Sequence, residues 1–280
     1  MGLSRIEKRF EELKSQNRAG LVTFITAGDP EYDVSLNILK GLPKAGADII
    51  ELGMPFSDPM ADGPAIQAAS IRALNHKMTL KKTIEMVREF RKIDDATPII
   101  LMGYYNPIYI YGVDRFLHDG LEAGIDGLII VDLPPEEDSE LAIPAKAADM
   151  AMIHLATPTT DQKRLVKILE NGTGFLYYVT IAGITGTQKP DLVPVKNALA
   201  NFRKQTNIPI AVGFGIKSHQ DAAQFAIFAD AVVVGSAIVD IIAQNIDQEG
   251  LAKSPLESKV LSFVSELAHG VKNARKNIED

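Results

Sequence analysis

Several features that would assign this chain to a particular class of protein are missing. The sequence contains no cysteine, which excludes disulfides, thiolate metal sites and a cysteine nucleophile, and which suits the cytoplasm. Acidic residues outnumber basic residues by 36 to 29, giving a formal net charge of −7, and no basic stripe runs through the sequence. We therefore expect no nucleic-acid partner.

Long hydrophobic runs are also missing. The longest apolar stretch, from Ala231 to Ala243, is interrupted by polar residues and a glycine. It is shorter than the roughly 20 residues that a membrane helix needs. The first residues of the chain are charged and amphipathic, unlike a signal peptide. The sequence therefore predicts a soluble cytoplasmic protein with no membrane contact.

The common cofactor and metal motifs do not occur. There is no Walker loop, and Gly213-Phe214-Gly215 lacks the third glycine of a dinucleotide fingerprint. The histidines are scattered without a pair at ligand spacing, which disfavours a zinc aldolase, and His154 is expected to be a packed or partnered side chain. No lysine ends an apolar run, as a Schiff-base aldolase would require. We expect no metal and no cofactor on this chain.

Short apolar runs that alternate with helical patterns dominate what is present. There are eight such runs: Leu21–Ile25, Ile49–Leu52, Ile99–Met102, Leu128–Val131, Met152–Leu155, Phe175–Val179, Ile208–Val212 and Ala231–Val234. Runs of this kind are typical of strands buried on both faces. A helix is expected before them, from about Ser4 to Ser15, and another closes the chain from about Leu256 to Asn277.

A weak internal repeat supports repeated βα units. Ala45-Gly46-Ala47-Asp48 precedes the second run, Ala123-Gly124-Ile125-Asp126 the fourth, and Phe228-Ala229-Asp230 the eighth. The glycines suit a left-handed helix C-cap. No polar linker divides the sequence, so we predict an α/β fold with a single domain over residues 1–280. The prediction is a (β/α)₈ TIM barrel with an extra N-terminal helix; an open doubly wound sheet is the alternative.

The most unusual stretch runs from Ile49 to Pro64. Glu51 interrupts a buried run, and Asp62 stands near the end of a loop rich in proline and glycine. Catalytic groups in barrels lie at the carboxyl ends of strands, and two carboxyls in different surroundings can hold different protonation states. The other interpretation is structural: Glu51 forms a salt bridge at a strand edge, and Asp62 caps the following helix. The local residues leave both open.

Glycine-bearing turns follow the last three apolar runs, at 182–186, 213–216 and 235–238. Glycine lets the backbone approach a ligand, and the helical segment Ala237–Ala243 would direct its N-terminal amides toward an anion. Each turn alone is an ordinary connection between a strand and a helix. Three such turns after three consecutive strands favour a phosphate site. The loop Thr187–Pro190 has the composition of a mobile lid, and a plain surface loop is the alternative.

Several of these stretches together resemble one family over nearly the whole chain. They are Phe24–Pro30, Glu51–Pro64, Tyr104–Pro107, Gly183–Gly186 and Gly213–Ile216. The second is highly specific. On these stretches the chain resembles the α subunits of tryptophan synthase, barrels that cleave indole-3-glycerol phosphate to indole and glyceraldehyde 3-phosphate. The resemblance therefore implies a carbon–carbon lyase of tryptophan biosynthesis.

The resemblance also implies roles for individual residues. Glu51 would be the acid–base residue, Asp62 would pair with the indole N–H, and Tyr177 would stand beside the reacting groups. The implied substrate-binding residues are Phe24, Tyr104, Ile129, Thr185, Gly186, Gly213, Phe214, Gly215, Gly235 and Ser236. Thr180-Ile181 departs from relatives that carry serine and arginine there, which puts the lid contacts of that arginine in doubt.

A partner is implied as well. It is the tryptophan synthase β subunit, in an αββα complex, with the pyridoxal phosphate carried by β. The implied interface residues are Pro55, Ser57, Asp58, Pro59, Asn106 and Pro107. The loop should also present Phe56 and Met60 on an exposed rim. Two alternatives stay open: a phosphate-binding isomerase or epimerase barrel, and a non-catalytic barrel that regulates a partner.

Overall fold

A computed structural model describes residues 2–180, 192–213 and 215–276, with side chains from residue 5 onward. Within these ranges the strands form one parallel sheet in the order β5-β4-β3-β2-β1-β9-β8-β7-β6. Their bounds are β1 Gly20–Thr26, β2 Ile49–Gly53, β3 Ile99–Gly103, β4 Gly127–Ile130, β5 Ala151–Met152, β6 Leu155–Ala156, β7 Leu176–Val179, β8 Ile210–Gly213 and β9 Ala231–Val234. Every predicted run therefore overlaps a strand.

The two edges of this sheet belong to one short stretch of chain. Ile153 and His154 separate β5 from β6. The Ile153 amide donates to the Leu128 carbonyl of β4 at 2.8 Å, and the His154 carbonyl accepts from the Tyr177 amide of β7 at 3.1 Å. The predicted fifth strand is thus divided, because its first half pairs with β4 and its second half with β7. This stretch closes the curled sheet, and the predicted (β/α)₈ fold is confirmed.

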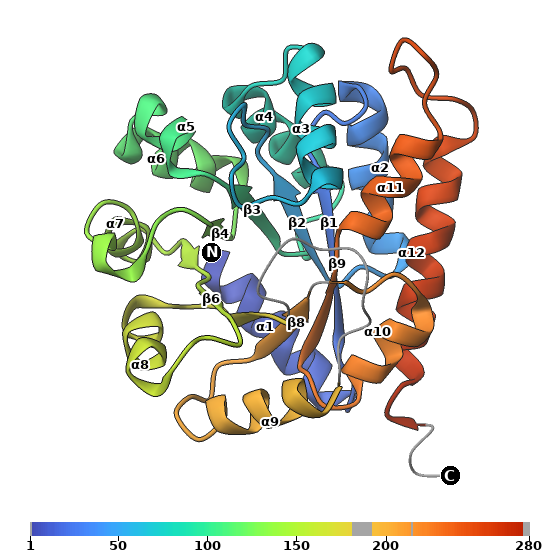
Figure 1. The fold of residues 1–280 in the computed structure, drawn as a ribbon. Helices are drawn as coiled ribbons and strands as arrows, with labels where there is room; N and C mark the ends of the chain where they lie inside the picture. The colour runs from blue at the N-terminus through green and yellow to red at the C-terminus, as the bar shows by residue number, and fades with distance from the viewer. Residues whose placement is uncertain (1, 181–191, 214, 277–280) are drawn as a thin grey trace.

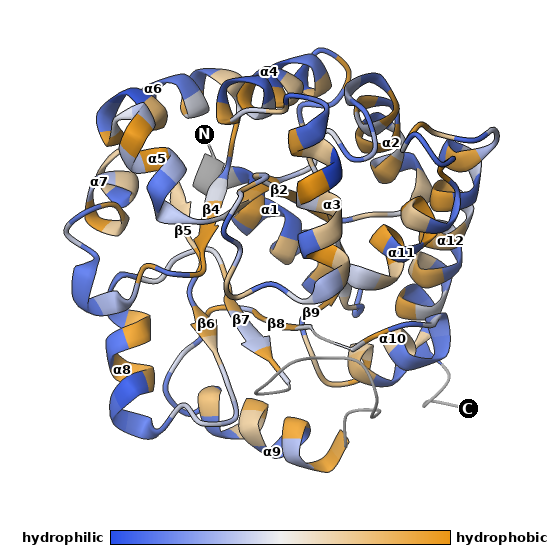
Figure 2. Cartoon of the chain, turned by 45° about the horizontal axis from the view of Figure 1, so that its top comes forward, coloured by the Kyte–Doolittle hydropathy of each residue, from blue (hydrophilic) through white to orange (hydrophobic). Residues whose placement is uncertain are grey.

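Helices surround the strands (Figure 1). Their bounds are α1 Gly2–Ser15, α2 Tyr32–Ala45, α3 Pro64–Asn75, α4 Leu80–Arg91, α5 Tyr105–Tyr111, α6 Val113–Ala123, η1 Pro135–Glu137, α7 Ala142–Ala147, α8 Gln162–Asn171, α9 Leu192–Phe202, α10 His219–Ala226, α11 Ser236–Gln244 and α12 Leu256–Asn273. Most alternate between hydrophobic and hydrophilic colouring in Figure 2, as helices with one buried face do. In the described ranges, none has the length and apolar character needed to cross a bilayer.

The buried side chains form two main shells, because successive residues of a strand point to opposite faces. The outer shell lies between the strands and the surrounding helices. The inner shell fills the barrel and includes Ile6, Phe10 and Leu13 of α1. The Phe10 ring lies 5.7 Å from that of Phe175, which precedes β7. The predicted N-terminal helix therefore contributes to the barrel interior at the amino ends of the strands.

The repeated aspartates ahead of three strands share one structural role. Asp48, Asp126 and Asp230 each accept the backbone N–H of a residue in the preceding strand of the chain. The donors are Leu21, Ile99 and Ile210, at 2.9, 2.7 and 2.9 Å respectively. Gly46 and Gly124 end α2 and α6 with left-handed φ angles of 106° and 90°, as predicted for helix C-caps.

Candidate active site

Glu51 lies inside the barrel near the carboxyl end of β2. The neighbouring positions Ile49 and Gly53 share its face of the strand, and Ile49 belongs to the inner shell. Glu51 is 1% exposed, and its Oε1 atom has no hydrogen-bond partner among the described residues. Burial raises the pKa of Glu51 to about 8. The carboxyl group is therefore protonated at neutral pH and able to donate a proton.

Asp62 occupies a different environment at the end of the loop after β2. Its amide donates to the Pro59 carbonyl at 3.1 Å, and its own carbonyl accepts from the Gln67 side chain at 2.8 Å. Burial raises the pKa of Asp62 to about 6, and a hydrogen bond with the Tyr104 hydroxyl opposes that rise. The Tyr104 hydroxyl also accepts the Ala61 amide at 2.9 Å. Asp62 is thus held in place and mostly ionised at neutral pH.

The structural interpretations of these two acids are wrong. Glu51 forms no ion pair with any residue that the structure describes. The N-cap of α3 is Gly63, without a side-chain hydrogen bond, so Asp62 does not cap that helix. Neither acid therefore has the structural role that this interpretation gave it.

Asp62 and Phe24 line a small cavity at the carboxyl ends of the strands. Its volume is about 10 Å³, the space of roughly one water molecule. The lining residues are Phe24, Thr26, Gly53, Met54, Asp62, Ile66, Ser70, Met102, Gly103 and Val131. The sequence did not single out Ser70 or Met102, and it included Thr26 only as part of the stretch Phe24–Pro30. Period-two alternation from Phe24 would have pointed to Thr26, whose buried hydroxyl has no partner among the described residues.

Two further predicted residues, Tyr177 and Ile129, lie inside the barrel. Both belong to the inner shell, and neither lines the small cavity. Burial, followed by the nearby Glu51 carboxyl, raises the pKa of Tyr177. A Cβ atom on Gly213 would come within 2.4 Å of the Tyr177 hydroxyl. The absence of a side chain at Gly213 therefore provides the space in which the tyrosine stands close to Glu51.

The described part of the predicted phosphate site lies at neighbouring strand ends. β8 and β9 pair with Gly213 opposite Val233, so Gly235 follows at the same edge of the barrel. Gly235 is the N-cap of α11, and Ser236 is its first residue. First-turn amides have no acceptor within a helix, and they carry the positive end of its dipole. Gly215 has a left-handed φ of 78°, which glycine adopts without strain.

Some predicted features lie outside the described residues. They are Thr185, Gly186, Phe214 and the loop Thr187–Pro190. Their roles stay predictions.

The residues assigned to the partner interface lie along one loop and one short helix. Pro55, Ser57, Asp58 and Pro59 follow β2, whereas Asn106 and Pro107 lie in the first turn of α5. Ser57, Asp58 and Asn106 are exposed. Met60 is 81% exposed, as expected. Phe56 is instead half-buried, with its ring 5.2 Å from that of Tyr104. The loop therefore packs against Tyr104, the tyrosine whose hydroxyl is hydrogen-bonded to Asp62.

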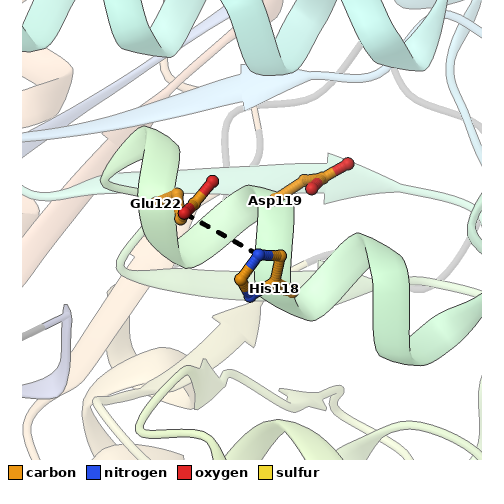
Figure 3. Close-up of side chains that lie close together, drawn as sticks. All are labelled: His118, Asp119 and Glu122. Carbon is orange, nitrogen blue, oxygen red and sulfur yellow. Dashed lines mark ion pairs between the residues drawn. The ribbon is translucent and has the colours of Figure 1, made fainter.

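One group of possible metal ligands occurs among the described residues. His118, Asp119 and Glu122 of α6 place ligand atoms within 4.8 Å of one another (Figure 3). Each already has a partner: His118 lies 3.7 Å from Glu122, the Tyr111 hydroxyl donates to Asp119 at 2.6 Å, and Arg88 lies 3.9 Å from Glu122. These contacts describe a surface network of ion pairs, and we propose no metal there.

The histidine expected to be packed or partnered is packed. His154 is 5% exposed, and its Nε2 atom lies 3.5 Å from Asp138. Burial lowers the pKa of His154, so it is neutral at physiological pH. It belongs to the segment that closes the barrel, and its Nε2 atom makes no hydrogen bond with a described residue.

Comparison with known proteins identifies the family. A family model described as tryptophan synthase alpha chain matches residues 10–270. The chain belongs to this family. The described fold is similar to tryptophan synthase subunit alpha from Legionella pneumophila strain Paris, at 41% identity and a TM-score of 0.88, covering 96% of this chain and 98% of that one. An alpha chain from Legionella pneumophila subsp. pneumophila matches at 39% identity and a TM-score of 0.86, covering 96% and 97%.

A tryptophan synthase structure from M. tuberculosis, in a ligand-free form, is more distant. It matches at 30% identity and a TM-score of 0.84, covering 96% of this chain and 99% of that chain. As a tryptophan synthase alpha chain, the protein is a lyase of tryptophan biosynthesis that cleaves indole-3-glycerol phosphate. Alpha chains of this family do not themselves bind pyridoxal phosphate. The isomerase and non-catalytic alternatives are therefore not retained.

Proposed function

We propose that the lyase reaction is a retro-aldol cleavage carried by Glu51 and Asp62, without a Schiff base or a metal. The observation that supports this most directly is the contrast between the two carboxyl groups. Glu51 is fully buried with a pKa of about 8, and Asp62 is half-buried with a pKa of about 6. Groups whose surroundings separate their pKa values in this way suit opposite roles.

The chemistry assigns one role to each group. Cleavage needs a proton at C3 of the indole, so that the ring can accept the electron pair of the breaking carbon–carbon bond. It also needs the adjacent glycerol hydroxyl to lose its proton as the carbonyl of glyceraldehyde 3-phosphate forms. Glu51 supplies the first proton and, as a carboxylate, takes up the second. Asp62 accepts the indole N–H and stabilises the positive charge that develops on the ring.

The remaining residues bind the substrate. Phe24, Tyr104 and Ile129 surround the indole, and Tyr177 lies beside Glu51. The phosphate binds to the amides at the ends of β8 and β9 and at the start of α11, through Gly213, Gly215, Gly235 and Ser236. Thr185, Gly186 and Phe214 are assigned to the same task by the resemblance. Support comes from the shared edge of the neighbouring strands and from the N-terminus of α11, where the Ile238 amide already donates to the Gly235 carbonyl and the amides before it face the same edge.

The proposal extends to the partner and to the organisation of the chain. The tryptophan synthase β subunit binds the loop 55–59 and the start of α5 in an αββα complex, and this chain needs no cofactor of its own. Residues 1–280 form a single domain, in which α1 and α12 both pack against the barrel. The cytoplasmic location stays a prediction from the sequence.

Replacement of Glu51 by glutamine tests the proposal. Because the carboxyl is protonated at neutral pH, the neutral amide should leave the fold intact. It cannot exchange a proton, so indole release should fall by at least ~10²–10⁴-fold. Turnover and thermal unfolding are measured on the same preparation, and glycerol phosphate binding serves as the control for an intact site. A well-folded variant with near-normal turnover would remove Glu51 from the mechanism.

A further inference from the structure

A second and larger cavity lies at the opposite end of the barrel from the catalytic loops. Its volume is about 460 Å³, within the range typical of small-molecule sites. It is lined by Phe10, Leu13, Lys14, Asn17, Arg18, Arg203, Thr206, Asn207, Ile208, Pro209, Asp230 and Arg275. Several of these residues directly precede β1, β8 or β9. This basal cavity is therefore distinct from the site at the carboxyl ends of the strands.

The basal cavity is positively charged in a protein whose formal net charge is −7. Its four cationic side chains are Lys14, Arg18, Arg203 and Arg275. Two carboxylates oppose them: Asp230 in the lining, and Asp48, which binds both terminal nitrogens of Arg18 at 2.8 and 2.7 Å. Four cations against two carboxylates leave a surplus of two positive charges. An anion is the ligand that this surplus favours.

Hydrogen-bond donors remain available on three of the cations. The Lys14 ammonium has no partner among the described residues. Arg203 makes one described contact, from Nη2 to Asp230 at 3.1 Å. Arg275 donates from Nε and Nη2 to the Ala226 and Ala229 carbonyls, at 3.1 and 2.7 Å, which leaves Nη1 without an acceptor in the described chain. A fixed guanidinium with a spare donor suits a carboxylate or phosphate.

The electrostatics of Arg275 agree with this geometry. Burial lowers its pKa, Asp230 opposes that change, and the charge of Arg203 lowers the pKa further. The two guanidinium groups therefore repel one another, and a bound anion would relieve the repulsion.

The rest of the lining indicates what carries the anionic group. The apolar surface comes mainly from the half-buried Ile208 and Pro209 ahead of β8, and small exposed parts of Phe10 and Leu13 from α1 add to it. We propose that the basal cavity binds a small organic anion, a carboxylate or phosphate ester on a flat apolar body. Its head group binds Lys14, Arg203 and Arg275, and its body lies on the apolar residues.

Calorimetric titration of the full chain tests the proposal. The two ligands are 3-phenylpropionate and phenyl phosphate, and the one that binds more tightly identifies the preferred head group. Lys14→Gln and Arg203→Gln should each weaken binding roughly fivefold, the equivalent of ~1 kcal/mol for a partly exposed charge pair. Both side chains are exposed enough for the fold to tolerate their loss. Lys204→Gln is the matched control, because Lys204 contacts Asn201 and does not line the cavity.

Three further binding measurements test the proposal: a neutral ligand, added salt and a variant at the other end of the barrel. The neutral 3-phenylpropionamide should bind much more weakly than the acid, and added salt should weaken the acid's binding. Asp62→Asn should leave binding unchanged, since Asp62 lies at the other end of the barrel. Equal binding of acid and amide, no binding of either anion, or undiminished binding by the Lys14→Gln/Arg203→Gln double variant would overturn the proposal. None of these readouts depends on turnover, so they are independent of the proposed catalytic mechanism.

Discussion

In the proposed mechanism, Glu51 and Asp62 need different protonation states. Glu51 has to begin protonated, and its pKa is about 8. Asp62 has to be ionised, and its pKa is about 6. Activity should therefore fall below pH ~6, where Asp62 gains a proton, and above pH ~8, where Glu51 loses one. The measurement is kcat/KM for indole release between pH 5 and 9. A flat profile across this range would contradict the assignment.

Tyr104 should control the acidic side of that profile. Its hydrogen bond to Asp62 opposes the rise in the carboxyl's pKa that burial causes. Tyr104→Phe removes this bond, so the pKa of Asp62 should rise and the acidic limb should move to higher pH. The basic limb belongs to Glu51 and should stay in place. Tyr105→Phe is the matched control, because its hydroxyl binds Glu140 at 3.0 Å. An equal shift in both variants would exclude a specific Tyr104–Asp62 interaction.

Glu51 stands out in the sequence because a glutamate within a buried strand contradicts its surroundings. Aspartate is common in loops, so the role of Asp62 was predicted from the resemblance and not from its neighbours. Thr26, Ser70 and Met102 could not be found in this way. Threonine in a strand, serine in a helix and methionine beside a core are ordinary residues there. Their position around the small cavity depends on pairing between β1, β2 and β3 and on the docking of α3.

The aspartates ahead of the strands should contribute to stability in proportion to their burial. Asp126 is 0% exposed and accepts Arg5 and Arg91 at 2.9 and 2.7 Å. Asp126→Asn can still accept the Ile99 amide. It removes the only carboxylate paired with Arg91 among the described residues and one of the two paired with Arg5, which keeps Asp95. We expect a loss of ~3–5 kcal/mol in the free energy of unfolding. Urea denaturation measures it, and a single cooperative transition would also support one domain.

Asp230→Asn is the control for that experiment. The partner of Asp230, Arg203, is 42% exposed, so the loss should be at most ~1 kcal/mol. Both asparagines keep the backbone hydrogen bond of the preceding strand. Equal losses in the two variants would show that burial of the ion pair does not determine the stability.

The N-terminus of α11 should bind phosphate in the absence of any indole. Glycerol phosphate should raise the melting temperature of the wild type by linkage. Gly235→Val should abolish this shift, because the branched side chain would occupy the approach to the first amides. Gly235→Ala should keep part of it, since its Cβ atom would lie 3.2 Å from Phe24 and requires only a small adjustment. For each protein, the melting temperature with glycerol phosphate is compared with the melting temperature without it, so that a loss of stability in a variant does not affect the result.

An undiminished shift in Gly235→Val would place the anion elsewhere. A shift lost in both variants would mean that the position tolerates no side chain at all.

The barrel could be predicted because its strands are buried on both faces. Such strands are nearly continuous apolar runs, and all of the predicted runs overlap observed strands. The division of the fifth strand was not predictable, since it depends on pairing with β4 and β7, which lie on either side of it in the barrel. α5, which was not predicted from the sequence, carries Pro107 in its first turn. Proline is tolerated in the first turn of a helix, and there the helix forms.

The loop between β2 and α3 connects the surface of the molecule to Asp62, the carboxylate that we propose acts on the indole. The Asp62 amide binds the Pro59 carbonyl at 3.1 Å, and Phe56 packs on Tyr104, which holds Asp62. Docking of the β subunit on Ser57, Asp58 and Pro59 would therefore restrict the position of Asp62. Because indole is small and able to diffuse away, direct delivery to a second enzyme would also limit its loss.

We expect the isolated chain to release indole slowly and the β subunit to accelerate that release. Asp58→Ala removes the acceptor of the Ser57 hydroxyl, which lies at 2.6 Å, and Pro59→Ala loosens the turn that leads to Asp62. Both should reduce the acceleration more than the basal rate. Glu11→Ala, on the exposed side of α1 at the far end of the barrel, is the control and should be accelerated like the wild type. Indole release is measured with and without the β subunit for all four proteins. Equal stimulation of all of them would show that contact at this loop is not what positions the carboxylate.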